Sequence, residues 1–270
     1  MQFRKVFQMS ARSDFRKAPK CPFGDLEWRD YYWEFPRQIP NYENEYWTET
    51  FDPDGVLRNM LSDTEWKNMV ADTVLITEKM NKITDGGRAL DIGCGRGGLL
   101  SNLGPQWEKH GVEPSPEAAK CASAHGSIIQ GDLSNTNYDR NSFNLITLNH
   151  VIEHLPNPLE MMHSCQKLLA PGGILMIATP DFDSPCARRF SLNYRMLHDP
   201  GHISLFTSFS LVKMLEDLGF KILEIDYPFF ETRFYTREAM SRMSDPTKVS
   251  PPFVGNHINV FAEYLTVNAS

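Results

Sequence analysis

The chain has 270 residues, 41% of them hydrophobic and 23% charged, and is long enough to bury a core without disulfide or metal staples. Its 34 acidic residues outnumber its 27 lysines and arginines, and the net charge of −7 argues against a basic surface that binds nucleic acid. Five cysteines without paired spacing favour a reduced chain, and no apolar run approaches the roughly 20 residues of a membrane span. We therefore expect a cytoplasmic protein with no nucleic-acid and no membrane partner.

Residues 1–54 are expected to form an N-terminal extension that precedes the main domain, residues 55–270. Between Trp28 and Phe51 the sequence holds nine aromatic residues in 24, against 11% in the whole chain. Disordered linkers are poor in aromatics, so this segment should be ordered. Two interpretations stay open, a clasp packed on the core and a lid whose rings line a pocket. Whether the basic residues 1–20 form a targeting segment also stays open.

A helix is predicted from Ser62 to about Lys82. Ser62 and Glu65 have the spacing of a capping box. The apolar residues Trp66, Met69, Val70 and Val74 fall on one helical face. The helix should end at residues 85–87 and lead into a strand.

That strand, residues 89–92, runs directly into a glycine-rich turn at residues 93–98. Glycines between a strand and a helix let the backbone approach a ligand, and the helix start offers free N–H groups. Gly93, Gly95 and Gly98 also satisfy G-x-G-x-x-G, so a dinucleotide-binding loop is an alternative. Asp91, two residues before the first glycine, favours a ligand with a cationic group.

Further strands are predicted at residues 111–113, 127–129, 143–148, 174–178, 220–225 and 258–264, with a helix at 208–219. Segments of about 181–206 and 228–255 have no clear period and are expected to be insertions that act as lids. Seven strands with helices between the first five predict an α/β fold with one doubly wound sheet.

From about Arg88 to Ile225 the chain resembles the class I S-adenosylmethionine (SAM)-dependent methyltransferases. The resemblance is carried by five motifs in order, Arg88–Leu100, Gly111–Glu113, Gly131–Leu133, His150–Leu155 and Leu169–Gly173. Within that superfamily, residues 150–155 resemble the ubiquinone-pathway O-methyltransferases, and residues 251–256 resemble methyltransferases of sugar, polysaccharide and natural-product pathways. The resemblance implies a Rossmann-like seven-stranded sheet with an antiparallel last strand, and SAM as the cofactor.

Ligands of open α/β sheets bind beyond the carboxyl ends of the strands. The resemblance implies that Asp91 engages the ammonium of SAM, that Glu113 accepts both ribose hydroxyls, and that Asp132 and Leu133 contact the adenine. Structural alternatives are a solvated strand end for Glu113 and a turn-forming role for Asp132. The expected cofactor contacts are Asp91, Gly93, Cys94, Gly95, Glu113, Pro114, Asp132, Leu133 and Asn149.

Residues 150–154 read H-x-x-E-H, a zinc-protease pattern, but Pro156 and Pro158 prevent the long helix that such a site needs. Metal-associated relatives have two glutamates and a histidine here, and in this chain His150 replaces the first glutamate. Because Mg²⁺ prefers oxygen ligands, we predict turnover without a metal. Glu153 and His154 could equally brace a short helix.

The predicted activity is transfer of a methyl group from SAM to a small-molecule acceptor, with oxygen preferred over nitrogen. A sugar, a polysaccharide precursor or a natural product would suit. A hydroxyl acceptor benefits from a base, and histidine suits that task at neutral pH. The candidate bases are His150, His154 and His202. The candidate acceptor contacts are Tyr46, Tyr194, His198 and Arg233. Two alternatives stay open, a nicotinamide-dependent oxidoreductase and a SAM-binding regulatory protein without turnover.

Overall fold

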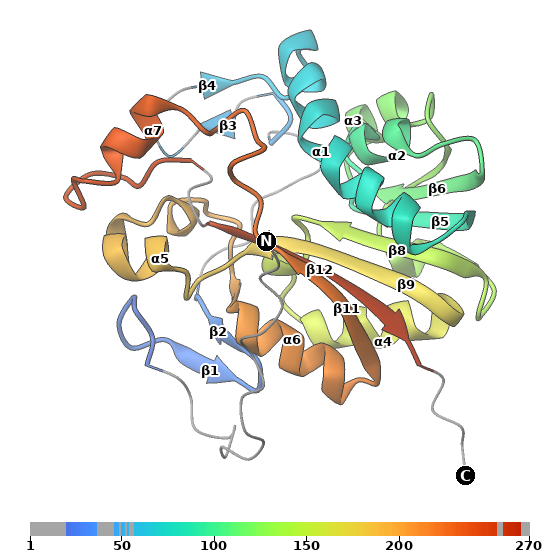
Figure 1. Ribbon diagram of the computed structural model, residues 1–270. Coiled ribbons are helices and arrows are strands. Elements are labelled where there is room, and N and C mark those ends of the chain that lie inside the picture. The colour runs from blue at the N-terminus through green and yellow to red at the C-terminus, as the bar shows by residue number, and fades with distance from the viewer. Residues whose placement is uncertain are drawn as a thin grey trace.

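The computed structural model describes residues 20–36, 46–48, 50–51, 53, 57–252 and 256–265. Its centre is a seven-stranded sheet in the order β11-β12-β9-β8-β5-β6-β7 (Figure 1). These strands span Gly87–Ile92 (β5), Trp107–Glu113 (β6), Ser127–Gln130 (β7), Phe143–Asn149 (β8), Leu169–Pro180 (β9), Phe220–Asp226 (β11) and His257–Tyr264 (β12). β5 pairs in parallel with β6 and β8, whereas β12 is antiparallel to both of its neighbours. The predicted fold is confirmed, including the antiparallel last strand.

Helices cover both faces of this sheet. α1 (Asp63–Ile83), α2 (Gly98–Asn102) and α3 (Pro116–Ala122) share one hydrophobic cluster with one face. α4 (Pro158–Leu168) and α6 (Ser208–Asp217) pack into a second cluster on the other face. None of the helices within the described ranges is long and apolar enough to cross a lipid bilayer.

Helix α1 begins where the sequence predicts, but it buries a different face. The Ser62 hydroxyl caps it by accepting from the Glu65 N–H at 3.3 Å. The buried side chains are Thr73, Ile76, Thr77 and Met80, whereas Val74 is 37% exposed. The two threonines can be buried because their hydroxyls donate to backbone carbonyls one turn earlier. The N-terminal half of α1 borders a cavity, so apolar periodicity there does not identify the core face.

The N-terminal extension joins the 181–206 insertion in a small separate sheet. β2 (Tyr32–Glu34) lies between β1 (Glu27–Arg29) and β10 (Ser204–Phe206) and pairs antiparallel with both. Trp33 is 1% exposed and packs with the side chains of α5 (Pro185–Phe190) and with Phe182. This part of the extension is therefore the clasp. Residues 1–19 lie outside the described residues.

The chain beyond the clasp reaches the carboxyl edge of the central sheet. Tyr46 and Trp47 line the cavity there, as the lid interpretation expects. A short hairpin follows, formed by β3 (Thr50–Phe51) and β4 (Leu57–Arg58). The second insertion contains α7 (Arg237–Arg242). The aromatic segment thus packs as a clasp in one part and reaches the cavity wall in another, and its action as a lid stays a prediction.

Candidate functional site

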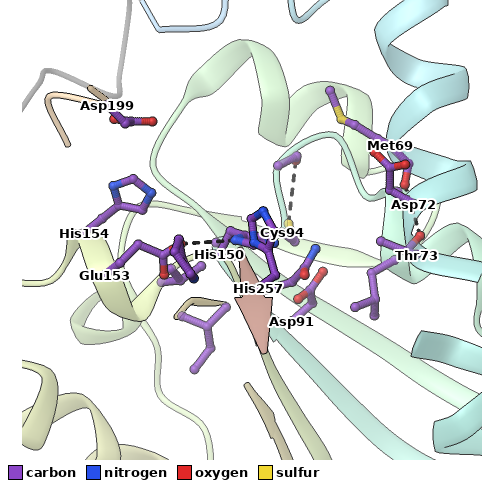
Figure 2. A pocket seen from close by; sticks show the side chains of 18 of the residues that line it. Met69, Asp72, Thr73, Asp91, Cys94, His150, Glu153, His154, Asp199 and His257 are labelled. Atoms are coloured by element: carbon purple, nitrogen blue, oxygen red, sulfur yellow. Dashed lines mark hydrogen bonds and ion pairs between the residues drawn. The ribbon is translucent and has the colours of Figure 1, made fainter. Parts of the chain in front are cut away.

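A cavity of about 640 Å³ lies at the carboxyl ends of β5, β6 and β8, which is the size range of small-molecule sites. Figure 2 shows Asp91 and the α1 residues Met69, Asp72 and Thr73 on one side of it, and Glu153 and His154 on the other. All nine expected cofactor residues line this cavity, as do Tyr46 and the histidines at 150, 154 and 202.

The glycine loop has two positions where a side chain would not fit. Gly93 and Gly95 have φ of +67° and +55°. A Cβ on Gly93 would lie 2.7 Å from Cγ2 of Val151, and one on Gly95 would lie 2.9 Å from Cη2 of Trp47. The backbone of this loop is thus packed against the wall after β8 and against the lid.

Glu113, at the end of β6, is 4% exposed and braces the glycine loop. Its Oε2 accepts from the Gly95 N–H at 2.9 Å, and its Oε1 accepts from the Ser115 N–H at 3.0 Å. Burial raises the pKa of this carboxyl, and the two N–H groups oppose the rise. The solvated-strand-end interpretation of Glu113 is therefore wrong.

Asp91 is the next-to-last residue of β5, directly before the glycine loop, and is 2% exposed. Burial raises the pKa of its carboxyl to about 7, the hydroxyl of Thr147 opposes this by donating to Oδ1 at 2.6 Å, and the charge of Glu113 adds to the rise. A carboxylate in this position is costly unless a cation compensates it. A ligand with an ammonium group would meet that need.

Asp132 forms the turn after β7 and also borders the cavity. It caps the 3-10 helix η1 (Leu133–Asn135), because its Oδ1 accepts from the Ser134 N–H at 2.8 Å. The structural interpretation of Asp132 is thus correct. Asp132 and Leu133 both line the cavity.

His150 begins the other half of the site. Its φ of +57° is rare for a residue other than glycine, and its N–H donates to the carbonyl of Ala178 at 2.9 Å. Nδ1 of His150 lies 3.2 Å from Oε1 of Glu153, whose Oε2 accepts from the Thr179 hydroxyl at 3.0 Å. A strained backbone held in this way fixes the direction of the imidazole.

Glu153, in the 3-10 helix η2 (Ile152–His154), is fully buried. Burial acts to raise the pKa of its carboxyl, but the hydrogen bond from His150 and the nearby imidazoles of His154 and His202 hold it at about 2. Burial lowers the pKa of His154, and it lowers that of His257 well below the usual value. The ring of His257 packs edge-on against His150 at 4.7 Å between centroids. The site therefore concentrates imidazoles around one buried carboxylate.

Three of the four expected acceptor contacts do not line the cavity. Tyr194 is 0% exposed, and its hydroxyl donates to the carbonyls of Asp181 at 3.1 Å and Asn256 at 3.0 Å. His198 is exposed, with Nε2 3.1 Å from the carbonyl of Leu192. The prediction that Tyr194 and His198 contact an acceptor is corrected, because one is a core residue and the other faces outward.

Arg233 lies next to the cavity and not in its wall. Its Nε and Nη2 donate to Oδ1 and Oδ2 of Asp72 at 3.0 Å and 2.9 Å. Asp72 itself lines the cavity, so this bidentate ion pair ties the second insertion to α1 at the edge of the site. The guanidinium of Arg233 is thus committed to a protein partner.

Other cavity residues were not predicted from the sequence. They include Trp47, Arg58, Asp72, Arg195, Asp199, His257 and Asn259. His257 and Asn259 could have been placed here from the sequence, because they lie at the start of the antiparallel last strand. An antiparallel strand starts at the edge of the sheet where the parallel strands end. Asp72 lies in the predicted helix and Trp47 in the aromatic segment, whereas Arg58, Arg195 and Asp199 lie where the sequence has no periodic pattern.

The chain was compared with known proteins. A family model described as "Methyltransferase domain" matches residues 51–225. A ubiquinone biosynthesis O-methyltransferase of Xanthomonas oryzae pv. oryzae is 37% identical over 106 residues, which are 35% of this chain and 43% of that relative. The aligned part of the chain therefore spans less than half the length of the curated relatives it matches.

Two solved structures share the fold. A SAM-dependent methyltransferase of Archaeoglobus fulgidus superposes with a TM-score of 0.53 at 18% identity, over 74% of this chain and 97% of that one. The plantazolicin methyltransferase, solved with SAH, gives a TM-score of 0.51 at 16% identity, over 76% and 86%. At these identities the likeness concerns the fold alone.

Proposed function

Because the chain belongs to the methyltransferase domain family, we propose that it is a SAM-dependent methyltransferase that transfers the methyl group to a hydroxyl of a small molecule. The observation that carries this proposal is the chain of contacts from Thr179 through Glu153 to His150 at the cavity wall. The nicotinamide-dependent oxidoreductase is wrong as an interpretation of the glycine loop. A SAM-binding regulatory protein without turnover is the alternative that the activity test below would detect.

The cofactor half of the cavity fits the polar groups of SAM. Asp91 offers a buried carboxylate for the ammonium. Each oxygen of Glu113 spends one acceptor position on a backbone N–H, and a carboxylate has about four, so two remain for the ribose hydroxyls. Asp132 and Leu133 border the place proposed for the adenine. SAM supplies a methyl group on a sulfonium, which is already activated for displacement.

His150 is proposed as the base that takes the proton of the acceptor hydroxyl. Its Nδ1 faces the ionised Glu153, so the neutral imidazole carries its proton there and presents the lone pair of Nε2. The His150 side chain is 35% exposed, against 7% for His202, so His150 is the more accessible of these two candidate bases. Removal of a proton in this way is typically worth about 10²–10⁴-fold in rate.

Positioning supplies the rest of the rate enhancement. Holding the acceptor oxygen in line with the methyl carbon, roughly 3 Å away, can contribute several kcal/mol. Tyr46 and Met196, on two different segments, line the acceptor side of the cavity together with Phe234 on a third. Burial raises the pKa of Tyr46, so its hydroxyl stays a neutral donor at physiological pH. A curated relative that is an O-methyltransferase of ubiquinone biosynthesis supports oxygen as the acceptor atom.

The test is to incubate the enzyme with methyl-labelled SAM and pairs of small molecules that differ only in a hydroxyl or an amine at one position. The panel should include sugars, polysaccharide precursors and natural products. We expect label on oxygen, and a fall in kcat of about 10²–10⁴-fold in His150→Asn with the Kd for SAM within about twofold. His163→Asn, an exposed histidine on α4, is the matched control. Label on the amine alone, or full activity of His150→Asn, would contradict the proposal.

A further inference from the structure

The divalent-metal site that the resemblance implies does not fit this chain as a Mg²⁺ site. Relatives associated with a metal carry two glutamates and a histidine at positions that correspond to 150, 153 and 154. Here His150 stands first, and its Nδ1 lies 3.2 Å from Oε1 of Glu153, so it serves that carboxylate as a donor. One carboxylate and imidazole nitrogens are a poor donor set for Mg²⁺, which prefers oxygen ligands.

The fold brings a different residue to this place. His202, from the first insertion, lies beside η2, and its ring centroid is 4.8 Å from that of His154. Glu153, His154 and His202 each offer one ligand atom, and these three atoms lie within 4.8 Å of one another. We propose that Glu153, His154 and His202 bind a divalent transition-metal ion at the wall of the acceptor cavity.

Backbone groups hold the imidazole rings of His154 and His202 in defined orientations, as they do for histidines that bind a metal. Nδ1 of His202 lies 2.5 Å from the carbonyl oxygen of Met196, which can only accept, so this nitrogen carries the proton. The lone pair of His202 is therefore on Nε2, and Oδ2 of Asp199 is 3.7 Å from that atom. His154 has a hydrogen bond with the backbone of Gly201. Such outer partners of the second ring nitrogen are typical of metal-binding histidines.

Glu153 keeps acceptor capacity for an ion. Its two oxygens receive one hydrogen bond each, from His150 and Thr179, and about two acceptor positions remain. The carboxylate is fully buried, and a buried charge is stable only when an opposite charge compensates it. A divalent cation between the carboxylate and the two imidazoles would supply that compensation.

The donor set selects the kind of ion. Two imidazoles and one carboxylate suit Zn²⁺, Co²⁺, Ni²⁺ or Fe²⁺. Ligand atoms about 2.0–2.2 Å from such an ion lie roughly 3.4 Å apart, so closing from the present spacing needs side-chain shifts of under about 1 Å. Three protein ligands leave a position open to the cavity, as in catalytic sites. Its use for the acceptor oxygen rests on the proposed function, whereas ion binding itself does not.

The experiment is a titration of the chelator-treated, full-length protein with Co²⁺, followed by visible absorption. We expect one saturable site with the d–d bands of a Co²⁺ ion bound by nitrogen and oxygen. His202→Ala should bind Co²⁺ about 100-fold or more weakly. His198→Ala is the matched control, because His198 is exposed in the same insertion and lies outside the cavity wall, and it should bind as the wild type does.

Absence of saturable Co²⁺ binding in the wild type, or equal affinity in His202→Ala, would overturn the site. Circular dichroism checks folding, and His154→Ala replaces His202→Ala if the latter does not fold. Calorimetry with SAM on the same samples separates this proposal from the function. If the wild-type protein binds SAM but not Co²⁺, the ion site is wrong and the proposed function stands. If it binds Co²⁺ but not SAM, the proposed function is wrong and the ion site stands.

Discussion

Asp91 links the stability of the protein to cofactor binding through its protonation. Its pKa in the folded chain is about 7, against 3.8 as the ordinary value, so the folded state holds this proton more tightly than the unfolded state. The contribution to stability is fully present below pH 3.8 and is lost as the pH rises through 7. Between pH 5 and pH 8 these two pKa values correspond to a loss of stability of roughly 2–3 kcal/mol.

Replacing Asp91 with asparagine should therefore remove the cost of burying a charge and weaken the binding of SAM. The amide oxygen of Asn can still accept from the Thr147 hydroxyl, but the residue no longer ionises. The gain in unfolding free energy of Asp91→Asn over the wild type should be roughly 2–3 kcal/mol larger at pH 8 than at pH 5. Its affinity for SAM at pH 8 should fall by roughly 1.5–3 kcal/mol, the usual worth of a hydrogen bond to a charged group.

Urea denaturation at the two pH values and calorimetric titration with SAM measure both effects. Asp139→Asn is the control, because Asp139 is an exposed aspartate whose replacement makes the same chemical change outside the cavity. If Asp91→Asn and Asp139→Asn show the same pH dependence, or if Asp91→Asn binds SAM as the wild type does, the role assigned to Asp91 is refuted.

The remaining predictions concern the loop brace, the core and the cavity edge. Glu113→Ala should lose roughly 1.5–3 kcal/mol of SAM affinity in calorimetry, and the exposed Glu117→Ala should not. Tyr194→Phe removes the hydroxyl that donates to the carbonyls of Asp181 and Asn256, each of which keeps one backbone N–H donor, so the variant should unfold about 0.5–1.5 kcal/mol more easily in urea while kcat stays within twofold. A lower kcat at unchanged stability would return Tyr194 to the acceptor site. Arg233→Ala removes a part-exposed ion pair with Asp72, so the rate of SAM dissociation measured by stopped flow should rise by up to about fivefold. Because salt screens the same ion pair, added salt should raise the dissociation rate of the wild type. Unchanged dissociation with a raised KM for the acceptor would mean that Arg233 contacts substrate.

The cofactor half of the site could be read from the sequence because its signals are local. Asp91 and the glycines lie within a few residues of each other at one strand end, and Glu113 closes the next strand. Parallel strands bring their carboxyl ends to one edge, so the positions of these residues in space follow from their positions in the strands. The sequence did not show that Glu113 would brace the loop, since backbone contacts leave no mark in side-chain patterns.

The acceptor half could not be read in the same way. His198 and His202 are four residues apart in a segment without periodicity, yet only His202 reaches the cavity. What places His202 there is the pairing of β10 with β2, which joins residues about 170 positions apart in the chain. No local pattern encodes such a pairing. The candidate ion site was missed for the same reason, because its third ligand comes from this insertion.

The most direct measurement is a crystal structure of the enzyme with the demethylated product of SAM and a hydroxylated acceptor. We expect the product's ammonium at the Asp91 carboxylate, its ribose hydroxyls on Glu113, and the acceptor oxygen within hydrogen-bond distance of Nε2 of His150. A product bound elsewhere in the cavity, or an acceptor oxygen that faces away from His150, would contradict the account.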